Sequence, residues 1–168
     1  DSLTGLFNRG AMEEEIGALL RNKKGGVFLM LDVDHFKDIN DVYGHLTGDL
    51  VLQELSRIMG YLFFKKDIIG RMGGDEFAVL LIEQAEGDVL RTAECILEAI
   101  RAPFPLQEGE ARISSSVGVA FHSLEAATPA RLLKNADVAM YRAKGEGRDR
   151  LWRYRPSTFT DSGYGRVF

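Results

Sequence analysis

Apolar residues recur every three or four positions in four stretches of the chain, a spacing that is typical of amphipathic helices lying on a core. In the first stretch, Met12, Ile16 and Leu19 fall on one side and a run of glutamates on the other. Glycines directly after this stretch, and prolines after the third, mark where two of the helices end. The helices predicted in this way cover residues 8–24, 48–64, 87–101 and 128–144.

Short apolar runs between turn-forming residues predict five strands. The first strand is apolar throughout, so we expect it to be buried and to deliver Asp32 and Asp34 to its C-terminal edge. Between the second and third strands stand two glycines, which tolerate the positive φ of tight turns, followed by Asp75 and Glu76. This pattern predicts a β-hairpin. The expected strands cover residues 27–31, 67–71, 77–82, 113–122 and 150–154.

The order of helices and strands around this single hairpin indicates an α+β fold of the ferredoxin-like type. We expect a mostly antiparallel central sheet of about five strands, flanked by helices. The chain has 168 residues, 45% of them hydrophobic, with no internal repeat or linker, which favours one domain. We expect that domain to cover residues 1–155, and residues 156–168 to form a flexible tail or a linker to a further domain.

Composition narrows the classes of partner. A net charge of −4 argues against nucleic acid as the main partner. The longest apolar run, residues 27–31, is far shorter than the roughly 20 residues that span a bilayer, so no membrane contact is expected in this fragment. A single cysteine, Cys95, fits a reducing compartment and a cytoplasmic location. Because the chain begins at Asp1 without a methionine, we expect it to belong to a longer protein. The expectation of no membrane contact applies to this fragment and not to the full-length protein, which could be anchored to a membrane.

Acidic residues concentrate where the predicted strands end. If the first strand and the hairpin are neighbours, Asp32 and Asp75 face each other at the edge of the sheet. Paired carboxylates repel unless a cation lies between them, and Mg²⁺ takes oxygen ligands while keeping waters and substrate phosphates. The pattern therefore indicates a magnesium site for a nucleoside triphosphate. On pattern alone, a solvated hairpin turn and a capping Asp-Val-Asp remain the alternative.

Residues 73–77 read GGDEF, letter for letter the signature of bacterial diguanylate cyclases. Other blocks of the chain are similar to that family in the same order, and the resemblance covers about residues 1–152. It implies a ferredoxin-like fold related to nucleotide cyclases and polymerase palms. The remaining blocks are DSLTGLFNR from residue 1, DVDHFKDIND from residue 32, GH at 44, GD at 48, AD at 136, MY at 140, AK at 143 and GR at 147.

The resemblance implies a reaction and a metal site. Two GTP molecules would be condensed into cyclic di-GMP with release of two pyrophosphates, in a homodimer that meets through the active-site face with one GTP per subunit. Two Mg²⁺ per active half-site, with Mn²⁺ as a substitute, would be held by Asp32, Asp75 and the backbone carbonyl of Val33. Asp75 or Glu76 would accept the proton, and the sequence does not divide that role between them.

The resemblance also implies how the nucleotide is bound. Lys37, Lys144 and Arg148 match positions that hold the triphosphate. Independently of the resemblance, His35, Phe36 and Lys37 follow a strand at the start of a short turn or helix, so we expect their backbone N–H groups to be able to point at phosphate oxygens. From pattern alone, Lys144 and Arg148 are better explained as a favourable cationic end to a helix.

Guanine would be contacted by Asn40 and Asp49, and less strongly by His45, which could instead brace its turn. A carboxylate accepts from guanine N1–H and the exocyclic amine, whereas adenine offers no donor there, so we expect GTP to be preferred over ATP. Asn40 and Asp49 could also serve as turn and helix caps.

One stretch departs from the family. Many members carry Arg-x-x-Asp five residues before the signature, where the arginine binds the product and inhibits the enzyme. Here the stretch is Phe64-Lys65-Lys66-Asp67, so the guanidinium is missing. We therefore expect weak or absent product inhibition through that site.

Two other classes of function stay open from the sequence. The chain could be a non-catalytic GTP-binding regulatory or sensor module within a larger signalling protein, or a ferredoxin-like interaction domain that binds no nucleotide. Incubation with GTP and Mg²⁺ distinguishes a cyclase from the regulatory module, because only the cyclase forms product. If GTP does not raise the melting temperature in the presence of Mg²⁺, the interaction domain is favoured.

Overall fold

The computed structural model describes residues 1–22, 26–63, 66–82, 86–106, 109–122 and 128–156. Phe64 and Lys65, which belong to the stretch that differs from the family pattern, lie outside the described residues. The expected tail also lies outside them from residue 157 onward. The elements, in chain order, are α1 (Arg9–Arg21), β1 (Gly26–Val33), α2 (Phe36–Tyr43), α3 (His45–Leu62), β2 (Ile68–Gly73), β3 (Glu76–Ile82), α4 (Glu86–Arg101), β4 (Phe104–Leu106), β5 (Gly109–Ala111), β6 (Ser115–Phe121), α5 (Pro129–Gly145) and β7 (Arg150–Arg153).

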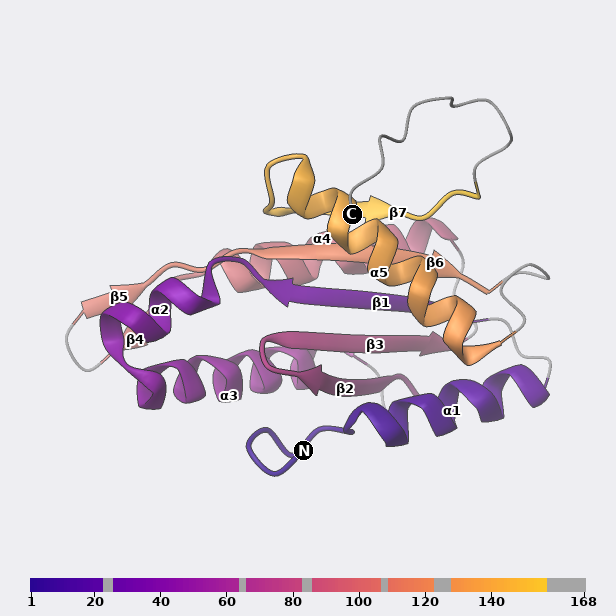
Figure 1. The fold of residues 1–168 in the computed structure, drawn as a ribbon, viewed down its shortest axis with the longest axis horizontal. Helices are drawn as coiled ribbons and strands as arrows, with labels where there is room; N and C mark the ends of the chain where they lie inside the picture. The colour runs from indigo at the N-terminus through magenta and orange to yellow at the C-terminus, as the bar shows by residue number, and fades with distance from the viewer. Residues whose placement is uncertain (23–25, 64–65, 83–85, 107–108, 123–127, 157–168) are drawn as a thin grey trace, which may run out of the picture.

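The main sheet has five strands in the order β2-β3-β1-β6-β7 (Figure 1). Every neighbouring pair is antiparallel except β6 and β7, which are parallel. The predicted α+β fold with a mostly antiparallel five-stranded sheet is thus confirmed. A separate two-stranded hairpin of β4 and β5 was not predicted, because three-residue strands carry no readable alternation.

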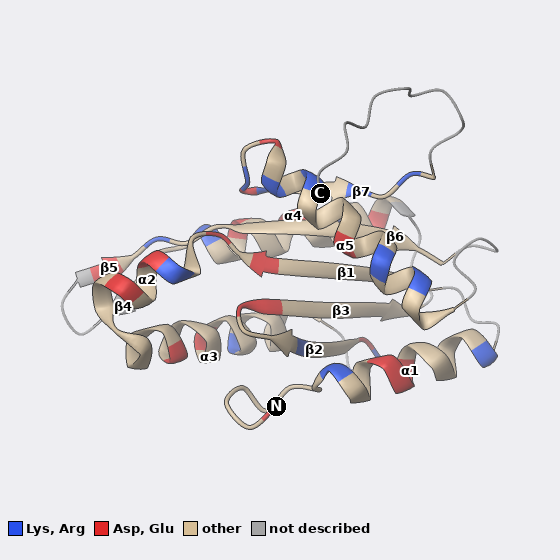
Figure 2. Ribbon diagram, in the orientation of Figure 1, with Lys and Arg blue, Asp and Glu red and all other residues tan. Residues whose placement is uncertain are grey.

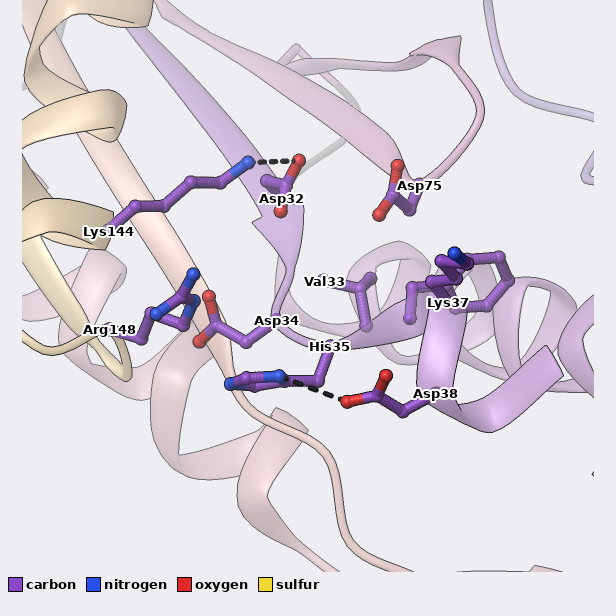
Figure 3. A pocket seen from close by; sticks show the side chains of 10 residues that line it. Asp32, Val33, Asp34, His35, Lys37, Asp38, Asp75, Lys144 and Arg148 are labelled. Atoms are coloured by element: carbon purple, nitrogen blue, oxygen red, sulfur yellow. Dashed lines mark hydrogen bonds and ion pairs between the residues drawn. The ribbon is translucent and has the colours of Figure 1, made fainter. Parts of the chain in front are cut away.

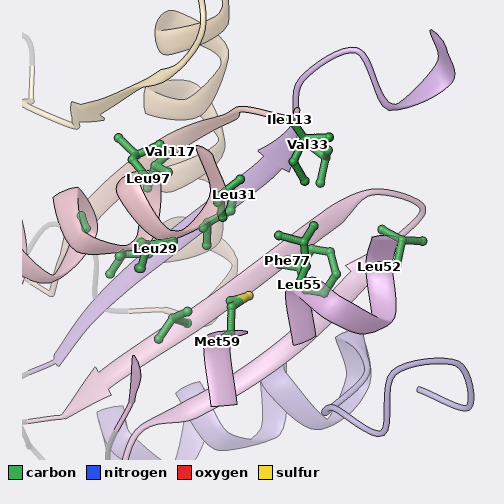
Figure 4. Packing of buried hydrophobic residues seen from close by; sticks show 14 of the residues in the cluster. Leu29, Leu31, Val33, Leu52, Leu55, Met59, Phe77, Leu97, Ile113 and Val117 are labelled. Carbon is green, nitrogen blue, oxygen red and sulfur yellow. The ribbon is translucent and has the colours of Figure 1, made fainter. Parts of the chain in front are cut away.

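The central strand β1 is buried along its whole length, with a different helical layer on each face. Leu29 and Leu31 point into the core formed with α3 and α4 (Figure 4). Phe28 and Met30 point to the other face, into the core formed with α1 and α5. Figure 1 shows α1 and α5 in front of the sheet and α4 behind it. The continuous apolar run read from the sequence is therefore explained by burial on both faces.

Between β1 and α3 the chain forms the short helix α2, which is not among the four helices predicted from the spacing of apolar residues. Gly44, with φ of 83°, ends α2 and allows α3 to begin at once, so α3 starts at His45 rather than at the predicted residue 48. The first helix begins after Asn8, whose side chain accepts a hydrogen bond from the Ala11 N–H at 3.0 Å. Within the described ranges, no helix combines the length and apolarity needed to cross a membrane.

Candidate active site

The pairing of β1 with β3 brings the acidic residues to one end of the sheet. Asp32 lies opposite Glu76 in the antiparallel register, and the Val33 N–H donates to the Asp75 carbonyl at 3.2 Å. The turn before β3 requires its glycines, because Gly73 and Gly74 have φ of 145° and 53°. The expectation that the first strand and the hairpin are neighbours is confirmed, and Figure 2 shows their acidic ends side by side.

Beside this end of the sheet lies an open cavity of about 390 Å³. It is bounded by the end of β1, the start of α2, the β2–β3 turn and the C-terminal end of α5 with the loop after it (Figure 3). The cavity brings together most of the residues assigned to the site from the sequence, and it adds Asp34 and Asp38 to them. Its lining residues are Asp32, Val33, Asp34, His35, Phe36, Lys37, Asp38, Asp75, Lys144 and Arg148.

Asp32 is paired with Lys144 across the cavity. The Lys144 Nζ lies 2.7 Å from Asp32 Oδ2, and only 10% of the Asp32 side chain is exposed. Burial raises the pKa of Asp32 above its ordinary value, repulsion from Asp75 and Glu76 adds to the rise, and the hydrogen bond from Lys144 opposes it. The acidic end of the sheet therefore favours a positive charge next to Asp32.

Lys144 reaches Asp32 because α5 lies very close to the sheet. A Cβ on Gly118 of β6 would overlap the Ala136 carbonyl oxygen and the backbone of Met140, whose Cα would lie 2.9 Å away. Only glycine allows this approach, since such contacts are shorter than van der Waals packing permits. Gly118 thereby sets the height of α5 above the sheet, and with it the reach of Lys144.

The donor set fits a magnesium ion that is shared with phosphates. Among the residues that the structure describes, no group of three or more His, Cys, Asp and Glu side chains is arranged to hold a metal by itself. Mg²⁺ nevertheless binds commonly through one or two carboxylates, waters and substrate phosphates. Asp32 and Asp75 supply two carboxylates, and the ammonium of Lys144 already lies where a cation is favoured.

Asp34 has a different role from Asp32, although both follow the same strand. Its Oδ1 accepts from the Ser116 hydroxyl at 2.7 Å, and its Oδ2 accepts from the Ser114 hydroxyl at 2.7 Å and from the Asp149 N–H at 3.0 Å. The residue is 4% exposed. Asp34 therefore anchors the loop that follows α5, and three serines in a row at residues 114–116 were the sequence signal for such a polar contact.

Several residues assigned from the sequence lie outside the cavity lining. The side chain of Asn40 packs so closely against Gly48 of α3 that a Cβ on this glycine would overlap the Asn40 Oδ1. His45 and Asp49 are exposed in the first turns of α3. Glu76 faces α1, with Arg9 Nη2 3.7 Å from its Oε2. The three residues expected to contact guanine thus lie on α2 and at the start of α3, outside the lining of the acidic cavity.

Arg71, which was not assigned to the site from the sequence, holds the signature turn. It donates to the Gly74 carbonyl from Nε at 2.9 Å and from Nη2 at 2.7 Å, and its Nη1 lies 3.2 Å from Asp1 Oδ1. Asp1 Oδ1 in turn accepts from the Thr4 N–H at 2.9 Å. The sequence signal for this role was an arginine in an otherwise apolar strand, two residues before Gly73.

A family model described as "Diguanylate cyclase, GGDEF domain" matches residues 1–150, which is most of the chain. The chain belongs to this family. Diguanylate cyclase TpbB of Pseudomonas aeruginosa is 43% identical over 155 residues, covering 88% of this chain and 35% of the relative. The cyclic di-GMP phosphodiesterase PdeR of Escherichia coli is 37% identical over 159 residues, covering 93% of this chain and 24% of the relative.

The crystal structure of the GGDEF domain of TpbB superposes on this GGDEF domain with a TM-score of 0.86 at 36% identity, covering 91% of this chain and 99% of that one. The fold predicted from the resemblance is therefore confirmed. The chain spans only about a third of TpbB and a quarter of PdeR, so it corresponds to one domain of these longer relatives.

Proposed function

We propose that this GGDEF domain is a diguanylate cyclase that condenses two GTP into cyclic di-GMP and two pyrophosphates. The observation that carries the proposal is the pair Asp32 and Asp75 at one cavity, with the cations Lys37, Lys144 and Arg148 around it, in a chain of this family. In the reaction, each 3′-hydroxyl attacks the α-phosphorus of the other nucleotide, and the bond from that phosphorus to pyrophosphate breaks.

Asp32, Asp75 and the backbone carbonyl of Val33 would hold Mg²⁺, two ions per active half-site, with Mn²⁺ as a substitute. Mg²⁺ bound there would lower the pKa of the attacking hydroxyl and neutralise charge on the attacking and leaving oxygens. Asp32 would be one of the carboxylates that hold the ion, and burial, with repulsion from Asp75 and Glu76 added to it, raises its pKa.

Lys37, Lys144 and Arg148 would bind the triphosphate. Lys37 stands in the first turn of α2, and Arg148 in the loop after α5, on opposite sides of the acidic pair (Figure 3). Lys144 is paired with Asp32 in this structure, so it would exchange that carboxylate for phosphate oxygens as the nucleotide and its cation arrive. The guanidinium of Arg148 adds a forked donor that suits two phosphate oxygens.

Asp75 is the better supported proton acceptor. Its side chain lines the cavity, whereas Glu76 is paired with Arg9 and faces α1. An acceptor must come within hydrogen-bond reach of the hydroxyl that loses the proton. Asn40 and Asp49, with His45 nearby, would select guanine at the α2–α3 side of the site.

A homodimer completes the proposal. One cavity that holds one GTP does not bring two α-phosphates to two hydroxyls, so two copies would meet face to face through the open side of the cavity. The consumption of GTP agrees with a cytoplasmic domain, and the product would act as a bacterial second messenger.

A non-catalytic GTP-binding regulatory module is the second candidate. One relative that matches 93% of the chain is a cyclic di-GMP phosphodiesterase, so GGDEF domains also occur in proteins named for the opposite reaction. Such a module would bind GTP and Mg²⁺ and release no product.

The deciding experiment incubates the domain with GTP and Mg²⁺ and measures cyclic di-GMP and pyrophosphate. We expect one cyclic di-GMP for every two pyrophosphates, and loss of both in Asp75→Asn. Asp137→Asn, an exposed aspartate of α5, is the matched control and should retain the activity. Binding of GTP without product would favour the regulatory module, and no binding at all would reject both.

A further inference from the structure

The loop between α5 and β7 has an unusual backbone. Arg148 and Asp149 are consecutive non-glycine residues with φ of 61° and 49°. This left-handed region is disfavoured for residues with a Cβ, and two in a row persist only where surrounding contacts hold them. Arg148 lines the cavity, so the conformation of this loop decides where its guanidinium lies.

Two sets of contacts hold Asp149, one from each side. On the inner side, its N–H donates to Asp34 Oδ2 at 3.0 Å. On the outer side, Arg101 donates from Nε to Asp149 Oδ1 at 2.8 Å and from Nη2 to the Asp149 carbonyl oxygen at 3.0 Å. Arg101 is the last residue of α4 and lies 48 residues from Asp149 along the chain.

We propose that Arg101 is a positioning residue for nucleotide binding. The Arg101 guanidinium binds both the side chain and the backbone carbonyl of Asp149 and so holds this residue in the left-handed conformation. That conformation of the loop directs the Arg148 side chain into the cavity. Arg101 does not line the cavity, so it acts through Arg148 and not on the substrate. The inference rests on the proposed function, because it assigns the triphosphate to Arg148.

A simpler role for Arg101 is a surface ion pair, or a favourable charge at the C-terminal end of a helix. Its exposure of 46%, against 43% for Asp149, is compatible with that role. Arg91 of the same helix offers the comparison, because it pairs with Asp88 one turn away and does not line the cavity. A general loss of surface charge would affect Arg91→Ala and Arg101→Ala alike.

The test measures affinity for a non-hydrolysable GTP analogue with Mg²⁺, and KM and kcat for GTP. We expect Arg101→Ala to weaken binding about three- to tenfold, with KM rising more than kcat falls, and Arg91→Ala to have no effect. Arg101→Lys should recover only part of the affinity, since one ammonium does not replace a fork that binds two oxygens. In an Arg148→Ala background, Arg101→Ala should add nothing further.

A nucleotide-free measurement separates this inference from the proposed function. Hydrogen exchange at the Asp149 amide should accelerate in Arg101→Ala and stay unchanged in Arg91→Ala, because the first variant frees the loop. Unchanged exchange in Arg101→Ala, or an undiminished effect on affinity when Arg148 is already alanine, would overturn the inference. If the unmodified domain binds no GTP, the proposed function fails, and the exchange rates still decide whether Arg101 holds the loop.

Discussion

Asp32 is held in a setting that opposes its charge. It is buried at the end of β1, with Asp75 and Glu76 nearby, and the compensating cation is the ammonium of Lys144. The net result is a pKa above that of an ordinary aspartate, because burial outweighs the hydrogen bond from Lys144. Residues kept for chemistry are often unfavourable for stability in this way.

Asp32→Asn should therefore stabilise the domain when divalent cations are removed. The folded state binds the Asp32 proton more tightly than the unfolded chain, so this group favours folding at acid pH, and the benefit is lost as pH rises from 3.8 through the raised pKa. At pH 7 in chelator, we expect a higher Tm for Asp32→Asn than for the unmodified domain, and a smaller difference as pH falls.

Thermal unfolding with and without Mg²⁺ checks this prediction. The unmodified domain should gain stability on addition of Mg²⁺ with GTP, and Asp32→Asn should gain much less. Asp137→Asn serves as the exposed control. A lower Tm for Asp32→Asn in chelator at pH 7 would contradict the account of the buried charge.

Asp49 should determine the choice of base. Asp49→Ser removes the carboxylate that would accept two guanine donors, so the preference for GTP over ATP should fall by about 5- to 150-fold, corresponding to about 1–3 kcal/mol. The measurement is the ratio of kcat/KM for the two nucleotides. Because Asp49 is exposed at the start of α3, the Tm should hardly change, and an unchanged ratio would remove Asp49 from the guanine site.

At the scale of elements, the contact between α5 and β6 positions the cationic side of the site. Gly118→Ala would drive a methyl group into the Ala136 carbonyl oxygen, so α5 must shift. We expect a loss of about 1–3 kcal/mol in the free energy of unfolding, together with weaker binding of GTP because Lys144 moves with the helix. Chemical denaturation and nucleotide titration measure the two effects.

Gly60→Ala is the matched control for this substitution. Gly60 lies in α3, where an added Cβ would meet nothing within 4 Å, so alanine should be neutral or stabilise by up to about 1 kcal/mol. Equal stability of Gly118→Ala and Gly60→Ala would show that α5 tolerates a larger separation from the sheet.

Residues 64–67, directly before β2, lead to a prediction about inhibition by the product. Lys66 and Asp67 are described by the structure, and Asp67 Oδ1 accepts from the Ile82 N–H at 3.3 Å. With phenylalanine at position 64 in place of arginine, added cyclic di-GMP should inhibit turnover weakly or not at all through this site. Potent noncompetitive inhibition that is abolished by Asp67→Ala would contradict this prediction.

At the scale of the whole molecule, the sequence predicted the parts that depend on local pattern. The buried strand that delivers Asp32, the neighbouring hairpin with Asp75 and the helix that bears Lys144 were all placed correctly, because periodicity and turn residues carry that information. The ion pair of Lys144 with Asp32 and the bond from the Asp149 N–H to Asp34 were not predicted. The second joins residues 115 positions apart and depends on a left-handed loop that no local pattern specifies.

Assembly should control the rate of the isolated domain. If two copies each supply one GTP, specific activity should rise with protein concentration in the micromolar range. Fusion to a dimeric coiled coil should abolish that dependence by raising the effective concentration of the second copy. A constant rate per molecule in a monomeric sample would contradict the face-to-face arrangement.

The edge strand β7 has a consequence for where the domain can be cut. The family match stops at residue 150, yet β7 runs Arg150–Arg153 along β6, and the Tyr154 N–H donates to the Val119 carbonyl at 2.8 Å. A fragment trimmed at the family boundary would lose the pairing of β7 with β6, and the segment with Arg148 and Asp149 would then depend on its contacts with Asp34 and Arg101. The pairing with β6 therefore favours a fragment that extends at least to Tyr154.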